Sequence, residues 1–364
     1  MRKTLKYNLK VAVVILNYNG LEHLQNYLNS IIKHLPEFAK LYVADNGSTD
    51  ESLEFLRRYE KDLTVLELKH NTGYAGGYNN ALGQIEAEYY YLINSDVEFL
   101  EEGLSAMVDF LDHNPSFVAC QPKIRSLTRP HEFEYAGAAG GWLDQLGYPL
   151  CRGRILGTNE EDHGQYDQIS KIFWATGAAL LVRSEDFHFV GGFDADFFAH
   201  MEEIDLSWRL QRIGKHIAVV PQSVVYHLGG GTLDYSSPRK TFLNFRNSLY
   251  ILVKNERGHL LPALLLSRLI LDGVAAIRFI LQGDFGNFKA IWKAHMHLYR
   301  RFGKMWKKRK NFLRLLNEHG IDERIALDGR YRGCIVWDYY IMGKRKFSEL
   351  NINEQREKQL SGDF

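Results

Sequence analysis

Short apolar runs alternate with amphipathic segments through the first hundred residues of the chain. The runs at 11–16, 40–44, 63–68 and 89–93 are typical of strands buried on both faces of a parallel sheet. Between the first two runs, apolar residues recur at helical spacing over 21–34. This alternation of strand and helix predicts a doubly wound α/β unit.

Small polar residues follow each of these predicted strands. In an open α/β sheet, ligands bind outside the carboxyl ends of the strands. Asn17, Asp45 and Asn71 are therefore expected along one edge of the sheet, where a nucleotide would bind. The run at 89–93 ends in Asn94-Ser95-Asp96, and Asp96 is the first candidate for chemistry. A plain turn or helix cap explains the same three residues equally well.

The segment 70–80 is a glycine-containing loop that opens the next predicted helix. Its glycines allow close approach of backbone to a ligand, and the helix N-terminus supplies free N–H groups for a diphosphate. These glycines do not fit the GxGxxG dinucleotide fingerprint. A loop without a ligand is the alternative interpretation.

The second part of the pattern is less regular. Residues 128–168 predict an insertion of loops with a hairpin, and 172–183 predict a strand that Thr176-Gly177 interrupts.

A helix begins near residue 202 with Glu202, Glu203 and Asp205 in its first turn. The helix dipole accounts for acids there, yet two adjacent glutamates also suit a catalytic base. His227 ends a strand and becomes a ligand candidate only if it lies beside Asp96.

The last third of the chain is predicted to be helical and basic. The apolar segment 259–281 carries a polar stripe that includes Arg268 and Asp272, and these charges argue against a membrane-spanning helix. The segment 285–317 has ten Lys or Arg residues and no Asp or Glu. This pattern predicts contact with an anionic membrane surface. Packing on the catalytic domain or on the second subunit of a homodimer is the alternative.

Composition excludes several classes of protein. A net charge of +1 with 45% hydrophobic residues describes neither a disordered chain nor one that coats nucleic acid. The cysteines Cys120, Cys151 and Cys334 are widely spaced and indicate reduced thiols, hence a cytoplasmic protein. The first apolar run is too short for a signal-peptide core, so secretion is not expected.

Seven motifs, taken together and in order, resemble the family 2 glycosyltransferases. They are VVILNYNG, VADNGSTD, HNTGYAGGYNNAL, INSDVEF, ATGAALLVRS, FFAHMEEIDLSWRL and VVYHLGGGT. The resemblance covers about residues 9–250 and is greatest to the bacterial rhamnosyltransferase-like branch. It implies a GT-A, Rossmann-like catalytic domain at 1–250, with a donor half at about 9–125 and an acceptor half at about 170–250. A helical, basic extension is expected at 251–364.

The resemblance also implies a role for each matching residue. The donor would contact Asn17, Tyr18, Asn19, Asp45, Asn71, Gly73, Gly77, Asn79 and Ser95. A divalent cation, Mg²⁺ or Mn²⁺, would be bound by Asn94, Asp96 and His227, and the acceptor would be bordered by Trp174, Thr176 and Gly177. Glu202 or Glu203 would be the catalytic base.

The implied reaction is transfer of a sugar, with inversion, from a nucleotide-diphosphate donor to a glycan hydroxyl. A polyprenyl-diphosphate-linked acceptor at the inner face of the cell membrane, in surface polysaccharide assembly, fits the basic helices. The alternatives are a sugar-phosphate nucleotidyltransferase and a non-catalytic scaffold. Asn94 and Glu203 motivate the scaffold alternative, because each replaces an aspartate that is usual in the family.

Overall fold

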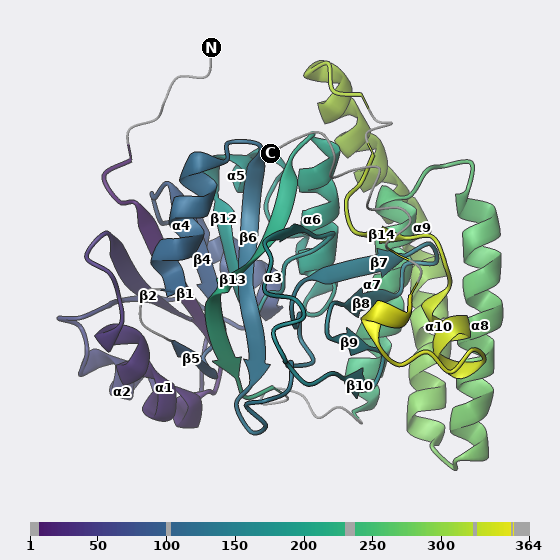
Figure 1. Cartoon of the computed structure of the whole chain (residues 1–364), viewed down its shortest axis with the longest axis horizontal. Coiled ribbons are helices and arrows are strands. Elements are labelled where there is room, and N and C mark those ends of the chain that lie inside the picture. The colour runs from purple at the N-terminus through teal and green to yellow at the C-terminus, as the bar shows by residue number, and fades with distance from the viewer. Residues whose placement is uncertain (1–6, 100–102, 230–236, 323–325, 351, 353–364) are drawn as a thin grey trace.

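A large mixed sheet forms the centre of the protein (Figure 1). The computed structural model describes residues 7–99, 103–229, 237–322, 326–350 and 352. The strands of this sheet are β1 (Val11–Asn17), β2 (Ala39–Asp45), β3 (Thr64–Glu67), β4 (Tyr89–Ile93), β5 (Val97–Phe99), β6 (Phe117–Ser126), β11 (Ser170–Lys171), β12 (Ala179–Arg183) and β13 (His216–His227). They lie in the order β11-β13-β6-β12-β4-β1-β2-β3, and β5 pairs with β13.

Helices cover both faces of this sheet, as the strand–helix alternation predicts (Figure 1). They are α1 (Leu21–Lys33), α2 (Ser52–Arg57), α3 (Gly73–Leu82), α4 (Gly103–His113), α5 (Ser184–Phe189) and α6 (Glu202–Arg212). Alternate residues of β1 serve two hydrophobic cores: Val13 packs with α1 and Val14 packs with α3. All five residues of β4 are buried, which confirms the predicted central strand.

One strand prediction in the second part of the chain needs correction. Only β12 forms from the predicted strand at 172–183, because Phe173 and Trp174 pair with Gly141 of another sheet instead. The strand that ends at His227 is β13, which begins at His216 and has a bulge between Val220 and Val224. Pro221 lacks a backbone N–H and lies in this bulge, where a ladder hydrogen bond is not required.

The insertion at 128–168 forms a second, smaller sheet. Its strands are β7 (Gly141–Asp144), β8 (Pro149–Cys151), β9 (Arg154–Ile155), β10 (Thr158–Asn159) and β14 (Arg330–Tyr331). β14 pairs in parallel with β7, so the C-terminal region returns to the sheet formed by the insertion. The sequence pattern did not predict this return.

Helices make up most of the C-terminal region, as predicted (Figure 1). They are α7 (Pro238–Asn255), α8 (Leu261–Leu281), α9 (Phe285–Glu318) and the short α10 (Ile335–Tyr340), with 3₁₀ turns at Ala195–Phe197 and Phe347–Glu349. α7 packs on α6 and α9, and α8 lies on their outer side. Within the described ranges, no helix combines the length and apolarity that crossing a bilayer requires.

Candidate active site

The ends of β1 and β2 form the predicted polar edge of the sheet. Asn17 and Asp45 are direct neighbours in the parallel register, and Asn17 Nδ2 donates to Asp45 Oδ1 at 3.0 Å. Tyr18 follows, with 42% of its side chain exposed. Asn19 Oδ1 accepts from the backbone N–H of Thr49 at 2.7 Å, so this side chain joins the loops after β1 and β2. The edge is therefore held in place before any nucleotide arrives.

Asn46 is a buried residue of this edge that the sequence analysis missed. Its Nδ2 donates to Asn71 Oδ1 at 3.2 Å and to the Gly73 carbonyl at 3.1 Å. It thereby joins the end of β2 to the start of α3. Its position directly after Asp45, at the same strand end, was the signal that could have identified it.

The glycines of the loop before α3 have packing roles in this structure. Gly73 has a φ of +76°, and a Cβ there would lie 2.4 Å from the carbonyl oxygen of Phe198. A Cβ on Gly77 would lie 2.8 Å from the Leu16 side chain, because α3 packs tightly on β1. Close approach of the backbone to a diphosphate is therefore not needed to explain either glycine.

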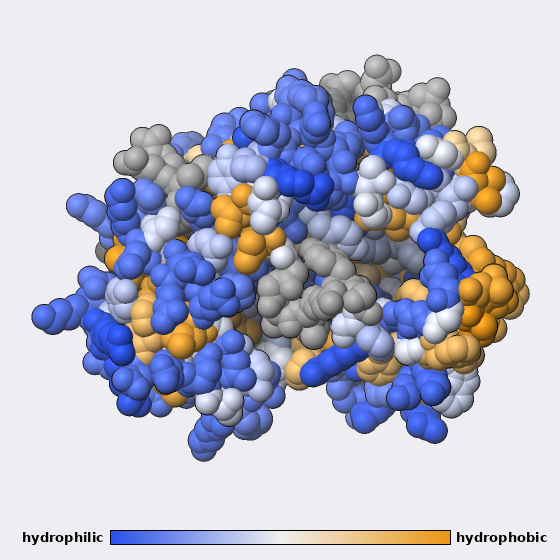
Figure 2. Space-filling model, turned by 90° about the horizontal axis from the view of Figure 1, so that it is seen from below, coloured by the Kyte–Doolittle hydropathy of each residue, from blue (hydrophilic) through white to orange (hydrophobic). Residues whose placement is uncertain are grey.

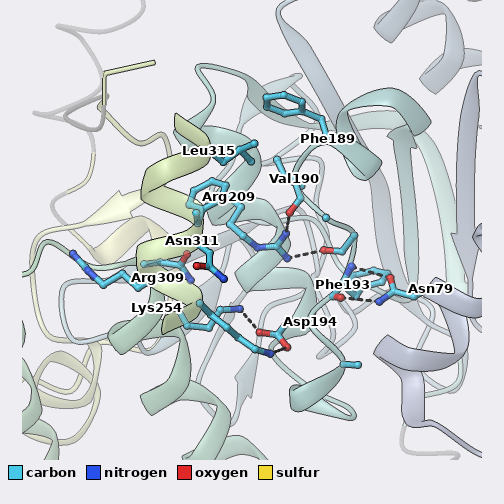
Figure 3. Close-up of a pocket in the computed structure, with 16 residues that line it drawn as sticks. Asn79, Phe189, Val190, Phe193, Asp194, Arg209, Lys254, Arg309, Asn311 and Leu315 are labelled. Carbon is cyan, nitrogen blue, oxygen red and sulfur yellow. Dashed lines mark hydrogen bonds and ion pairs between the residues drawn. The ribbon is translucent and has the colours of Figure 1, made fainter. Parts of the chain in front are cut away.

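Asn79, in α3, contacts the loop at 189–195. Its amide group makes a pair of hydrogen bonds with the backbone of Phe193, at 2.7 and 3.0 Å. Figure 3 shows it at the rim of a pocket of about 590 Å³ between the loop at 189–195, α7 and α9. The cations in this pocket are already paired: Lys254 Nζ lies 2.6 Å from Asp194, and Arg209 donates to the Val190 carbonyl at 2.7 Å.

Asp96, Asn94 and His227 lie together, and we call these three residues the metal corner. β5 runs antiparallel to β13 with Val97 opposite His227, which places the imidazole beside the turn after β4. His227 Nε2 lies 3.1 Å from Asp96 Oδ1 and 3.2 Å from Asn94 Nδ2. The condition set from the sequence, that His227 lie beside Asp96, is met. Ser95 lies in the same turn, with its Oγ toward Gly20.

Glu134, from the insertion, contacts the other side of the His227 ring. Its Oε2 lies 3.2 Å from His227 Nδ1, and both side chains are buried. Burial alone would lower the pKa of His227, but the charges of Asp96 and Glu134 outweigh it and raise the pKa to about 10. Burial would likewise raise the pKa of Asp96, yet His227 lowers it below its usual value.

The donor set of the metal corner suits a divalent cation that also binds phosphate. A carboxylate and an amide oxygen are acceptable ligands for Mn²⁺, as is the His227 imidazole once it has released its proton, and a carboxylate supported by substrate phosphates suits Mg²⁺. No group of three or more His, Cys, Asp or Glu residues in the described part of the chain could hold a metal ion. The remaining ligands would therefore come from Asn94, the diphosphate and water.

Residues 198–203, which we call the base segment, have a strained backbone. Phe198, His200 and Met201 have φ values of +66°, +68° and +70°. Each non-glycine residue in such a conformation costs of order 1 kcal/mol and persists only where the surroundings hold it. The strain immediately precedes Glu202, the first residue of α6.

Asn247 of α7 holds the base segment and was not predicted. Its Nδ2 lies within hydrogen-bond distance of the carbonyls of Phe197 (3.1 Å), Ala199 (2.9 Å) and His200 (2.7 Å). The neighbouring Arg246 donates to the Phe197 carbonyl at 2.7 Å. Asn247 is fully buried, so these bonds replace the water that would otherwise solvate the carbonyls. The only sequence signal for Asn247 was that Arg246 and Asn247 form a polar pair among the apolar residues of this helix.

Glu202, Glu203 and Asp205 share the first turn of α6 but differ in their partners. Asp205 accepts from Arg209 Nε at 3.0 Å and from Asn255 Nδ2 at 2.8 Å, and Lys254 Nζ lies 2.7 Å away. Glu202 Oε2 and Glu203 Oε2 are buried and have no hydrogen-bond partner among the described residues. Asp205 is therefore a structural anion, and the two glutamates retain unsatisfied oxygens.

The pKa shifts separate the same residues. Burial, then the charge of Glu203, raises the pKa of Glu202 well above its usual value. Burial raises the pKa of Glu203 to about 7. Burial would also raise the pKa of Asp205, but Lys254 and Arg209 lower it instead. Carboxyl groups with raised pKa values in a buried site are candidates for acid–base chemistry.

The segment 176–178 lies between the metal corner and the base segment. The Tyr74 hydroxyl donates to the Gly177 carbonyl at 2.7 Å, and the Asn94 N–H donates to the Ala178 carbonyl at 3.1 Å. Tyr74 is also close enough to Glu202 and Glu203 that their charges add to burial in raising its pKa. The structure thus brings the predicted metal ligands and the predicted base to the same region.

Two of the predicted acceptor residues have other contacts. The Trp174 ring is buried against Gly141, and its Nε1 donates to the Trp142 carbonyl at 3.0 Å. Thr176 is buried too, and its Oγ1 accepts from the Ala178 N–H at 3.1 Å. The Trp174 side chain thus packs against the second sheet, the Thr176 hydroxyl stabilises the turn before β12, and Gly177 lies next to Tyr74 at the site.

Comparison with known sequences finds similarity to glycosyltransferases. The model of glycosyl transferase family 2 matches residues 12–161. An N-acetylglucosaminyl-diphospho-decaprenol L-rhamnosyltransferase of Mycobacterium tuberculosis is 27% identical over 235 residues, which cover 60% of this chain and 75% of that protein.

Solved glycosyltransferases share the fold. A structure of GalNAc-T7 with UDP, GalNAc and Mn²⁺ has a TM-score of 0.53 at 17% identity and covers 68% of this chain and 48% of its own. The mannosyltransferase PcManGT from Pyrobaculum calidifontis, in complex with GDP-Man and Mn²⁺, has a TM-score of 0.50 at 14% identity, with coverage of 86% and 90%. At these identities the comparison establishes the GT-A fold and nothing finer.

Proposed function

We propose that this chain, which the model of glycosyl transferase family 2 matches over residues 12–161, transfers a sugar, with inversion, from a nucleotide-diphosphate donor to a glycan hydroxyl. The observation that carries this proposal is that Glu202 and Glu203 each have a buried oxygen without a hydrogen-bond partner among the described residues, near the Asp96–His227 pair. Inverting transfer requires both a base for the acceptor and stabilisation of the leaving diphosphate, and these two groups would supply them.

The donor would lie along the edge formed by Asn17, Asp45 and Asn71. The buried Asn17 Oδ1 has no hydrogen-bond partner among the described residues, which supports a ligand at this edge. Tyr18 is exposed beside it and offers an aromatic face to a nucleobase. A divalent cation held by Asp96 and His227, with Asn94 beside them, would neutralise charge on the departing diphosphate. Two solved relatives of the same fold contain Mn²⁺, which supports that choice of metal.

We assign the base to Glu203. A general base must be deprotonated at the working pH, and a pKa of about 7 meets this requirement near neutrality. Burial, then the charge of Glu203, raises the pKa of Glu202 well above its usual value, which disfavours its carboxylate form. The Glu203 carboxylate would accept the acceptor's hydroxyl proton while that oxygen bonds to the anomeric carbon from the opposite face. The bond from the anomeric carbon to the diphosphate breaks in the same step.

A lipid-linked glycan is the acceptor class that we propose. The named acceptor of the mycobacterial relative carries its sugar on a decaprenol diphosphate, and this chain covers 75% of that relative. The proposal places the chain in assembly of bacterial surface polysaccharide, at the inner face of the cell membrane.

Thermal shift of the purified protein tests the donor site. We would screen UDP, dTDP, GDP and CDP sugars with and without Mn²⁺, using Asp96→Ala as the matched variant. The proposal expects a metal-dependent rise for one nucleotide that Asp96→Ala abolishes. Absence of any rise would contradict the donor site, and release of diphosphate from a nucleoside triphosphate and a sugar phosphate would indicate a nucleotidyltransferase instead.

A further inference from the structure

Helix α8 is amphipathic with its polar side facing the protein. Arg268 and Asp272 are each 1% exposed. Arg268 donates to Asp272 Oδ1 at 3.2 Å, and Tyr148 donates to the same oxygen at 2.9 Å. His295 Nε2 lies 3.0 Å from Asp272 Oδ2. A surface helix of a globular protein normally has the opposite arrangement, with its apolar side toward the core.

The outer side of α8 is apolar over its whole length. Its most exposed residues include Leu266, Ile270, Val274, Ile277 and Leu281, from 58% to 82% exposed. Arg278 is the one charged residue of α8 that is exposed. Figure 2 shows the resulting group of apolar residues at the edge of the molecule where α8 lies. A contiguous apolar patch on this scale marks an interaction surface.

Aromatic and basic residues border this patch. Phe285, Trp292 and Tyr299 of α9 are 52% to 58% exposed. Lys289 and Lys293, on the same exposed side of α9, have no ion pair with any residue in the described ranges. Beyond the end of α8, Trp337, Tyr340, Ile341 and Met342 are also exposed, and Arg278 donates to the Tyr340 hydroxyl at 3.2 Å.

We propose that this surface, which we call the apolar ledge, lies in the boundary between the headgroups and acyl chains of an anionic bilayer. The ledge consists of the outer side of α8, the exposed aromatic residues of α9 and the exposed residues at 337–342. α8 has 21 residues and is about 31 Å long, and its polar side packs on the protein while its apolar side faces outward, so it would lie along the membrane plane. Aromatic side chains suit the interface, and the unpaired lysines suit anionic headgroups.

Charge favours a bilayer over a second copy of the chain. A symmetric dimer through this surface would bring the basic sides of two α9 helices close together, with like charges facing each other. Residues 285–317 contain no Asp or Glu that could compensate them. Anionic headgroups supply the missing negative charge.

The ledge is joined to the base segment through α7. Arg268 donates to Ser248 Oγ at 2.8 Å, and the preceding residue, Asn247, binds the carbonyls of the base segment. A membrane bound at the ledge would therefore have a fixed position relative to Glu203. The inference goes beyond the proposed reaction, since it concerns a surface that does not bind the donor.

Vesicle binding tests the ledge with the full chain. We would sediment the protein with vesicles of equal parts phosphatidylcholine and phosphatidylglycerol, and with phosphatidylcholine alone. The double variant Ile270→Glu, Val274→Glu is expected to reduce binding to the anionic vesicles by at least about tenfold, because both side chains point outward. Lys289→Gln with Lys293→Gln is expected to lower binding to anionic vesicles and to weaken its salt dependence.

Lys61→Glu is the matched control, since it makes the same change in charge at an exposed position shortly after α2, and α2 lies on the opposite side of the molecule from α8 (Figure 1). It should bind vesicles as the unchanged protein does. The metal-dependent thermal shift with the donor nucleotide should survive in every variant, so loss of the ledge is distinguished from failure of the proposed reaction. No binding to either vesicle type would overturn the inference. So would a dimer in analytical ultracentrifugation that Ile270→Glu, Val274→Glu converts to a monomer.

Discussion

The metal corner and the base segment both contain buried carboxylates, but they stabilise them differently. In the metal corner, Asp96 lies 3.1 Å from an imidazole whose pKa is about 10, so its charge is already compensated. In the base segment, Glu203 has an oxygen without a described partner and follows three residues with positive φ. The first region is held by charge pairing and the second by packing and by Asn247. Their responses to mutation and to pH should therefore differ.

Removing the base should have the largest effect. We expect Glu203→Gln to lower turnover by ~10²–10⁴, because general-base assistance typically contributes that much. The metal-dependent thermal shift with the donor should be retained, since the metal corner is unchanged. Turnover would be measured as release of the nucleoside diphosphate.

Two variants of α6 serve as controls for that prediction. Glu202→Gln should lose less turnover, because the proposal assigns the base to Glu203, and burial raises the pKa of Glu202 well above its usual value. Asp205→Asn should lower the melting temperature, because Arg209 and Lys254 would lose their common anion. Full turnover in Glu203→Gln would transfer the role of base to Glu202.

Removing the support of His227 should have an intermediate effect. Partners that orient a metal-binding histidine typically contribute ~10- to 100-fold to metal affinity, so Glu134→Gln should weaken Mn²⁺ binding by that factor. Isothermal titration with Mn²⁺ and the donor nucleotide measures it. Glu132→Gln, two residues away and paired with Arg129, should leave the affinity unchanged. Equal affinities in both variants would show that Glu134 does not support His227.

Loosening the base segment should have a smaller effect on turnover. Asn247→Ala leaves buried carbonyls without a donor, which costs about 1–3 kcal/mol of stability. We expect turnover to fall by ~10-fold because Glu203 is no longer held in place, while Mn²⁺-dependent donor binding persists. Asn311→Ala on α9 is the control for a lost surface amide. If turnover per folded molecule stays unchanged in Asn247→Ala, Asn247 is structural only.

Local patterns in the sequence predicted the central sheet and the metal corner. Buried parallel strands have a clear apolar signature, and Asp96 follows one of them directly. The position of His227 depended on one condition, contact with Asp96, which the β5–β13 pairing provides. The roles implied for Gly77, Asn79 and Trp174 stay predictions, and the structure gives each residue a packing contact as well. Each of these residues lies in one of the family motifs and also contacts another element of the fold. Contacts between elements that are distant in the sequence leave no periodic signal.

The same limit explains the residues that were missed. Glu134 lies in an irregular insertion, and Asn247 lies in a helix more than 40 residues after the base segment. Only the folded chain brings them to the site. The polar stripe of α8 was recognised, yet periodicity could not tell whether that stripe faces water or protein. Arg268 donates to Ser248 of α7, and this buried contact shows that the polar stripe faces the protein.

The pH dependence of turnover and of stability should be the smallest of these effects. Glu203 accepts a proton only when ionised, so turnover should rise with pH up to about 7 and then level off, with a loss of at most ~10-fold per pH unit below that. Stability should change in the opposite direction. A carboxyl whose pKa is raised by folding holds its proton more tightly in the folded state, so its ionisation lowers stability as pH rises from its usual value toward about 7.

Melting temperatures of the unchanged protein and of Glu203→Gln, measured across this pH range, separate the two contributions. The melting temperature of Glu203→Gln should increase relative to that of the unchanged protein as pH rises to about 7, because the amide cannot ionise. The metal corner contributes no such change near neutrality, since the pKa of His227 is about 10 and that of Asp96 is lowered. A constant difference in melting temperature would mean that Glu203 is already ionised throughout the range, and the base segment would then resemble the metal corner in having a compensated charge.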